Sequence, residues 1–299
     1  MGWWSSIKKA VKKVWRVIKA VVRAVVKIVV EIVSRVINSI AQILFFWKEK
    51  KIRIVVLILR DEKGNPLIDE DITNIDPIQV VLRNDLNDAI EYIKITFKKR
   101  MNIEIKPYGT LIQTLEGSAP TAALGVNCDS TARGIGISIA GAAILGGLGI
   151  LGGPVTIGVG IALGFGIGAA ISGKTSGGAL YNEFSEAGDY FAKNTAGWGW
   201  LRMNLYFPIT IFIVRDIAGK IGCSLGPLTD YVTVSINGVA RESTMAHELG
   251  HCCGLLHRKD QPFGKDQPDN LMWPNDPRGD NITGWQKFIV RTSRHCTFW

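Results

Sequence analysis

The sequence predicts an α/β fold of the α+β type, in which one domain carries two apolar additions. Apolar runs typical of buried strands alternate with stretches of helical periodicity in the second half of the chain. Two histidines lie four residues apart in one helical stretch. The 299 residues suffice for one large or two modest domains. Together, 47% hydrophobic residues and 33 glycines indicate an apolar surface in addition to the core.

The first predicted elements form a strand, a helix and a second strand. Residues 52–59 are almost continuously apolar, which predicts a buried strand. Asp76 followed by Pro77 is typical of a helix start, and apolar residues then recur at helical spacing. Residues 101–106 are predicted to return as a strand. This order favours a right-handed crossover between parallel strands.

The C-terminal part of the domain is predicted to contain two more strands and two helices. Residues 209–214 and 231–236 are rich in β-branched and aromatic side chains and predict strands. Residues 181–200 predict a short helix and a loop. Thr283 followed three residues later by Gln286 predicts a capping box that opens a C-terminal helix.

The segment HELGHCCGLLH has the spacing of a metal site. His247 and His251 lie on one face of a helix, so their ring nitrogens converge, and Glu248 faces the open side of a bound ion. Gly254 is suited to the left-handed conformation that ends a helix. The chain then returns His257 as a third ligand. Three neutral imidazoles leave a fourth position for water, as in catalytic zinc sites.

This ligand set predicts one catalytic Zn²⁺ ion and hydrolysis of an amide bond. Water bound to zinc has its pKa lowered to about 7. Glu248 is then predicted to accept the proton of this water as the water attacks a carbonyl. His295, the fourth histidine, is predicted to be structural or on the surface, because three ligands already complete the site.

With its glycine and third histidine, the segment resembles the metzincin metalloproteases, whose motif HExxHxxGxxH it matches at every fixed position. The local sequence is most similar to the pappalysin-type and neighbouring bacterial branches of this family. Met272, in the run NLMWP, matches the methionine turn that this family places beneath the zinc. No tyrosine follows Met272 where some branches carry a further ligand, so the resemblance implies no tyrosine role.

The resemblance covers roughly residues 50–110 and 195–299. It implies a mixed twisted sheet, an active-site helix, a C-terminal helix and endopeptidase activity on a protein or peptide. It also implies that residues 221–226 supply an antiparallel edge strand, along which an extended substrate pairs.

Residues 1–50 are predicted to form a cationic amphipathic helix. Residues 1–35 hold nine Lys and Arg against the single Glu31, so almost all of the net charge of +9 lies there. Charges in nearly every turn of the first half argue against a membrane span, and no signal peptide is recognisable. The pattern favours a helix lying on an anionic membrane. The predicted membrane-binding residues are Trp3, Trp4, Lys8, Lys12, Trp15, Arg16, Lys19 and Arg23.

Two other partners remain open for this helix: a partner subunit or delivery machinery, and the apolar insert of the chain itself. Nucleic acid is not expected, because the aromatic residues lie near the apolar face and not among the charges.

The catalytic domain, residues 51–299, is predicted to be interrupted by a glycine-rich apolar insert over residues 118–180. Residues 134–173 contain no charged side chain, and Pro154 divides them into two apolar halves. Each half is at the short limit for a helix that spans a bilayer, so a helical hairpin is predicted. The alternative is a hydrophobic lid packed against the N-terminal helix.

Five cysteines are too few for a disulfide scaffold. Cys252 and Cys253 are predicted to act as small apolar side chains, although a bridge from one of them to Cys296 stays open. Cys128 is a weaker candidate for a ligand that keeps the zinc inactive.

The function predicted from all these features is a membrane-associated zinc metalloendopeptidase, acting as a toxin or effector that is secreted or delivered to a target cell. The competing hypotheses are a membrane-permeabilising protein and a self-assembling protein, in which the protease domain is secondary.

Overall fold

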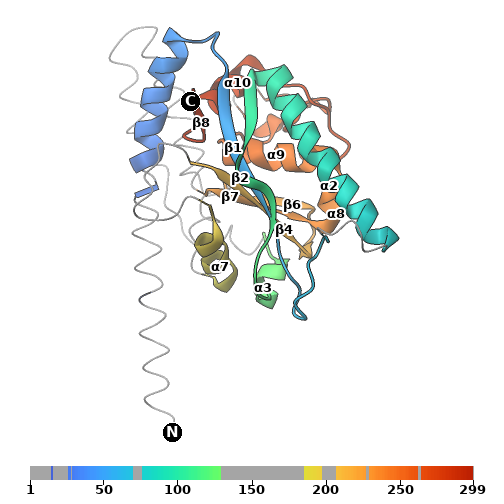
Figure 1. Ribbon diagram of the computed structural model, residues 1–299. Coiled ribbons are helices and arrows are strands. Elements are labelled where there is room, and N and C mark those ends of the chain that lie inside the picture. The colour runs from blue at the N-terminus through green and yellow to red at the C-terminus, as the bar shows by residue number, and fades with distance from the viewer. Residues whose placement is uncertain are drawn as a thin grey trace.

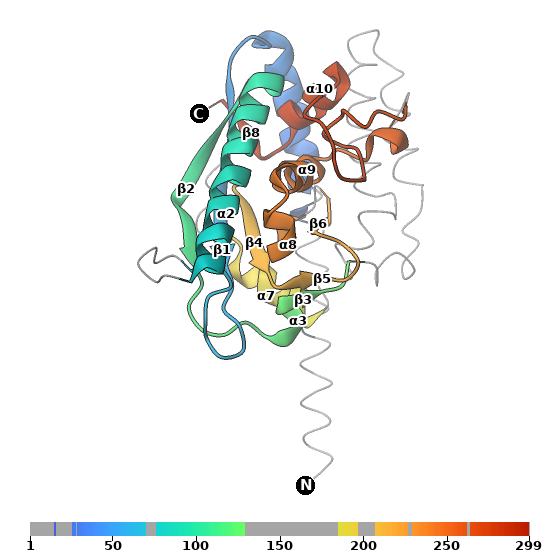
Figure 2. The same ribbon diagram turned by 90° about the vertical axis from the view of Figure 1, so that its right-hand side faces the viewer.

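A computed structural model describes the protein at residues 15, 26–27, 29–69, 76–128, 185–196, 207–226, 229–261 and 264–298. It confirms a mixed α/β fold built on a mixed sheet (Figures 1 and 2). Within the described ranges, no helix is both long enough and apolar enough to cross a membrane. The predicted hairpin around Pro154 and all of residues 134–173 lie outside the described residues.

The main sheet has the strand order β2-β1-β4-β7-β6, with β8 pairing off this path with β1. All neighbours are parallel except β6 with β7 and β8 with β1. The strands are β1 (Lys50–Ile58), β2 (Ile103–Thr114), β4 (Ile209–Val214), β6 (Gly222–Ser224), β7 (Tyr231–Ser235) and β8 (Cys296–Thr297). The predicted strands therefore form, and β6 is the predicted antiparallel edge strand.

The predicted crossover between β1 and β2 runs through α2 (Pro77–Thr96). The Asp76 carboxylate accepts a hydrogen bond from the Ile78 backbone at 2.9 Å, which confirms the predicted cap. A single π-helical turn, Phe97–Met101, continues α2 and ends at Asn102 with φ 55°. β2 begins there and is longer than predicted.

Helices cover both faces of the sheet. α2 and α9 (Glu242–Cys252) lie side by side in both views, while α7 (Glu186–Asn194) lies across the sheet from them (Figures 1 and 2). The Phe191 ring of α7 contacts Phe212 and Tyr231, with centroids 4.8 and 5.4 Å apart. Every residue of β4 and of β7 is buried, as expected for strands covered on both faces.

Short elements complete the domain. α10 (Gly284–Thr292) opens with the predicted capping box of Thr283 and Gln286. The chain leaves α10 before His295 and forms β8 against β1. The remaining elements are α3 (Thr121–Leu124), β3 (Gly125–Val126), β5 (Asp216–Ile217), α8 (Ile236–Val239) and η3 (Arg258–Asp260).

The N-terminal helix, described at residues 26–27 and 29–44, packs against the α/β domain with its polar side inward. Its buried residues are Lys27, Glu31, Arg35, Ser39 and Gln42. Its apolar side faces outward and continues into the turn that follows. The exposed residues are Val26, Val29, Val33, Ile37, Ile40, Ile43, Leu44, Phe45, Phe46 and Trp47. We call this set the outward apolar stripe.

Candidate metal centre

α9 carries the first two predicted ligands and the predicted base. His247, Glu248 and His251 are only 3%, 7% and 9% exposed. One helical turn separates the two histidines, so their rings meet with centroids 4.6 Å apart. The segment forms a helix here because β7 and α8 lead directly into it and its apolar side packs on α2 and the sheet.

Both imidazoles are held in one tautomer by backbone carbonyls. His247 Nδ1 lies 2.8 Å from the Leu271 carbonyl, and His251 Nδ1 lies 2.7 Å from the Leu255 carbonyl. A carbonyl only accepts, so each Nδ1 carries the proton and each Nε2 carries a lone pair. The two Nε2 atoms are 3.0 Å apart. Two lone pairs at this distance repel each other unless a cation lies between them.

Gly254 and His257 complete the group. Gly254 has φ +100°, which reverses the chain after α9 as predicted. His257 then returns to the other two histidines, with ring centroids 5.3 Å from His247 and 4.8 Å from His251. One ligand atom from each of the three lies within 4.8 Å of the others. His257 is the most accessible, with 35% of its side chain exposed.

The protonation state of the group suits a metal. Burial, followed by the charge of His257, lowers the pKa of His251 to about 3. Burial also lowers the pKa of His247 well below its usual value, and that of His257 below it. The rings are therefore neutral at pH 7, which is the form that binds metals. Three neutral imidazoles, two of them fixed by carbonyl partners, fit a zinc ion.

Met272 lies beneath α9, where the resemblance expects it. It is fully buried, and a Cβ added to Gly250 would lie only 2.6 Å from the Met272 sulfur. Asn270 fixes this turn, because its Oδ1 accepts from the Met272 backbone at 2.9 Å and its side chain pairs with Gln286 at 2.9 and 3.0 Å. Gln286 thus serves both the capping box and the floor of the centre, a link that the sequence did not reveal.

Glu248 lies against the edge strand β6. A Cβ added to Gly222 would lie 2.6 Å from the Glu248 Oε1 atom, and the Ser224 backbone N–H donates to the carboxylate. Burial raises the pKa of Glu248 to about 7, although nearby Arg278 and then Lys220 act to lower it. Glu248 is therefore suited to accept and release a proton near neutral pH.

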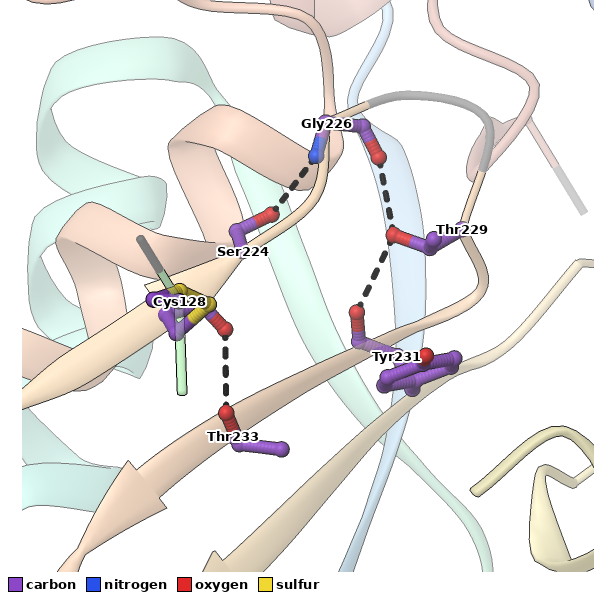
Figure 3. The surroundings of a disulfide bond; sticks show 7 residues. Cys128, Ser224, Gly226, Thr229, Tyr231 and Thr233 are labelled. Atoms are coloured by element: carbon purple, nitrogen blue, oxygen red, sulfur yellow. Dashed lines mark hydrogen bonds between the residues drawn. A yellow bond between two sulfur atoms is a disulfide. The ribbon is translucent and has the colours of Figure 1, made fainter. Parts of the chain in front are cut away.

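A disulfide joins Cys128 to Cys223 of β6 (Figure 3). The bridge to Cys296 that the sequence left open does not form, because Cys252, Cys253 and Cys296 are free, buried thiols. A zinc-ligating role for Cys128 is also wrong, since its sulfur is bonded to Cys223. Spacing alone does not determine which cysteines meet, so the sequence did not predict this bond.

Hydrogen bonds hold the strand end that follows the disulfide (Figure 3). The Thr233 hydroxyl of β7 donates to the Cys223 carbonyl at 3.3 Å. Beyond it, the Gly226 backbone donates to the Ser224 hydroxyl at 3.2 Å, and the Thr229 hydroxyl contacts the Gly226 carbonyl at 2.9 Å. The edge strand beside Glu248 is thus fixed covalently and by side chains of its neighbours.

The N-terminal helix reaches the end of α9. Arg35 donates to the Cys253 carbonyl at 2.9 Å and to the Ile289 carbonyl at 3.3 Å. This places a cation at the C-terminal end of the helix that carries His247 and His251. A Cβ on Gly254 would lie 2.5 Å from Arg35 Nη2. Glycine is therefore needed at this position both for the close approach of Arg35 and for the positive φ.

A buried ionic network surrounds Arg35. Glu31 accepts from Arg35 at 2.5 Å and lies 3.7 Å from Arg294, which in turn donates to Asp230 at 2.6 Å. All four side chains are at most 4% exposed. His295 lies 4.0 Å from Asp230 and donates through Nδ1 to the Phe207 carbonyl at 2.7 Å. His295 therefore belongs to this network and lies apart from the three-histidine group.

Most of the predicted membrane-binding residues lie outside the described part of the chain. These are Trp3, Trp4, Lys8, Lys12, Arg16, Lys19 and Arg23. Trp15 is described and is 57% exposed.

Comparison with known proteins leaves the site to be judged from its own geometry. No protein-family model matches the sequence, and no curated protein matches it significantly.

Proposed function

We propose that this protein is a zinc-dependent endopeptidase of the metzincin type, in which three histidines hold one zinc ion and Glu248 is the general base. The observation that carries this proposal is the pair of Nε2 atoms of His247 and His251, 3.0 Å apart and each fixed by a carbonyl at Nδ1. His257 is the third ligand. When bound, zinc supplies a Lewis acid and a water with a pKa of about 7.

The residues around the zinc ligands have the properties that peptide hydrolysis requires. Glu248 is buried, and its pKa of about 7 lets it take a proton from water and pass it to the leaving amine. The edge strand β6 lies directly against Glu248. An extended peptide that pairs with this edge by backbone hydrogen bonds brings a scissile carbonyl close to the base.

The test is cleavage of a peptide library by the wild type and by Glu248→Ala, with bound zinc quantified in both. We expect one zinc per chain in each and cleavage only by the wild type. Glu242→Ala is the matched control, because Glu242 is an exposed glutamate at the other end of α9 and should leave cleavage intact. Equal cleavage by Glu248→Ala, or no zinc in the wild type, would exclude the proposed mechanism.

We further propose that the protein acts at an anionic membrane, as a toxin or effector that is secreted or delivered to its target. The outward apolar stripe supports this, because ten large apolar side chains form one side of the N-terminal helix and its following turn. The excess of Lys and Arg in residues 1–35 favours anionic lipid over a neutral surface. Co-sedimentation with phosphatidylserine vesicles tests it, with neutral vesicles as the control.

The same stripe also favours a second function, membrane permeabilisation that is independent of proteolysis. Dye release from anionic liposomes separates the two. Release by Glu248→Ala at the wild-type level would favour permeabilisation, and binding without release would favour a membrane-docked protease. Light scattering without lipid tests the third alternative, self-assembly through the stripe.

A further inference from the structure

Arg278 is a buried cation whose hydrogen-bonding capacity is largely unused. Its side chain is 4% exposed, and neither Nε nor Nη1 has a hydrogen-bond partner. Its ion pair within the described chain is with Asp276, at 3.8 Å from Nε and too long for a hydrogen bond. Buried guanidinium groups normally have their N–H groups satisfied, so these donors need a partner from outside this part of the chain.

Arg278 is placed beside the candidate metal centre. It follows Met272 by a short loop, and the Met272 sulfur lies beneath Gly250 of α9. Its charge acts on Glu248 and on all three histidines. Of the charges that act on Arg278, Glu248 has the largest effect, ahead of Asp276. Glu248 and Asp276 are thus the two carboxylates whose charges act most strongly on Arg278.

The carboxylate of Asp276 is shared among several groups. Arg241 lies 3.6 Å from it, and the Ser243 hydroxyl lies 3.4 Å from it. Because Asp276 is divided in this way, it neutralises Arg278 only in part. Lys220 adds a second positive charge that acts on Glu248 from the turn before β6. The surroundings of Glu248 thus attract a further anionic group.

We propose that Arg278 forms an anion-binding subsite that receives a carboxylate of the substrate beside the scissile bond. This inference rests on the proposed endopeptidase function and adds a substrate class to it. A guanidinium holds a carboxylate through charge-assisted N–H donors, and Nε and Nη1, which lie on different edges of the guanidinium, both lack a hydrogen-bond partner within the described residues. The carboxylate comes either from an acidic side chain or from the C-terminus of a short substrate.

Matched peptides distinguish the two sources. In one series, a cleaved peptide carries Glu or Gln at each of the positions flanking the scissile bond. In the other, the same peptide ends in a free acid or in an amide. We expect the carboxylate form in one series to be preferred in kcat/KM by about 10- to 100-fold. The series that shows the preference identifies the source.

Variants assign the preference to Arg278. Arg278→Met should reduce it to about 1-fold, and Arg278→Lys, which keeps the charge but not the fork, should leave a part of it. Arg241→Met is the matched control: it removes a cation from the same Asp276, but Arg241 is 64% exposed, so the preference should persist. A preference unchanged in Arg278→Met would overturn the inference.

Binding decides the question separately from cleavage. Calorimetry with zinc-loaded Glu248→Gln compares the Kd of carboxylate and amide peptides, with and without Arg278→Met. If the wild type cleaves no peptide but binding of the carboxylate depends on Arg278, the subsite stands and the endopeptidase proposal falls. If the wild type cleaves peptides but shows no carboxylate preference in cleavage or in binding, the endopeptidase proposal stands and the subsite is excluded. Zinc content of each variant shows that the centre is intact, and Arg278→Lys replaces Arg278→Met if that variant does not fold.

Discussion

The central strands and the N-terminal helix are held in the molecule by opposite kinds of contact. Strands β1, β4 and β7 are buried through branched apolar side chains. The helix instead buries Glu31 and Arg35 and leaves its apolar side exposed. Apolar packing tolerates small changes of shape, whereas a buried charge without its partner is costly. The helix is therefore fixed in one orientation by a few residues, and its apolar surface stays available.

Breaking the ionic network should have the largest effect on stability. Arg35→Met removes the hydrogen bond to Glu31 and those to the Cys253 and Ile289 carbonyls. We expect a loss of about 3–5 kcal/mol in the free energy of unfolding. Chemical denaturation measures it, and a loss below about 1 kcal/mol would mean that the helix is not held as described.

Acid should weaken the same ionic network through protonation of His295. Burial, followed by the charge of Arg294, lowers the pKa of His295 from 6.5 to about 4. Between pH 6.5 and about 4, the unfolded chain therefore binds a proton at His295 more readily than the folded chain does. The stability that His295 contributes above pH 6.5 is lost as the pH falls towards 4. This accounts for on the order of 2–3 kcal/mol.

The difference between the wild type and His295→Gln isolates this contribution, because the other buried histidines are common to both. Unfolding of both proteins, with zinc bound, is followed across the interval from pH 7 to 4. The variant should lose less stability than the wild type. Parallel curves would show that His295 keeps its ordinary pKa.

In the sheet, a comparable deletion should have a smaller effect. Ile211→Val removes one methylene from a fully buried position on β4. We expect about 0.5–1.5 kcal/mol of destabilisation, without a change in zinc binding. A loss of unfolding free energy as large as that in Arg35→Met would contradict the expected difference between the central sheet and the N-terminal helix.

On the exposed side of the helix, substitution should hardly alter stability. Ile37 is 59% exposed, so Ile37→Ser is expected to change the free energy of unfolding by less than about 0.5 kcal/mol. Binding to anionic vesicles should nevertheless weaken by several-fold. Ser34→Ala, a change at a partly buried position of the same helix, is the control, and unaltered vesicle binding by Ile37→Ser would argue against docking through the stripe.

The sequence predicted the features that depend on short spacings. The buried strands follow from continuous apolar runs, and the convergence of His247 and His251 follows from the helical repeat. Asp76 and Thr283 were found because caps have local signatures. The edge position of β6 was expected only from the resemblance.

Features that depend on distant residues were not predictable. Amphipathicity shows that a helix has two unlike sides, but not which side faces inward. For the N-terminal helix, that choice depends on Asp230 and Arg294, about 200 and 260 residues further along the chain than Glu31. Arg278 is a single arginine in a loop and forms no pattern. The partner of Cys128 is likewise set by the fold and not by spacing.

The disulfide between Cys128 and Cys223 gives the site a dependence on cellular location. Cys128 is the last described residue of the predicted insert, residues 118–180, and Cys223 lies in the strand beside Glu248. Such a bond persists where thiols are oxidised and is rare in the reducing cytosol. In a reducing cytosol the chain would therefore lack this tether on β6, whereas in an oxidising compartment it would keep it. The place where the protein folds thus becomes part of what determines when the site is complete.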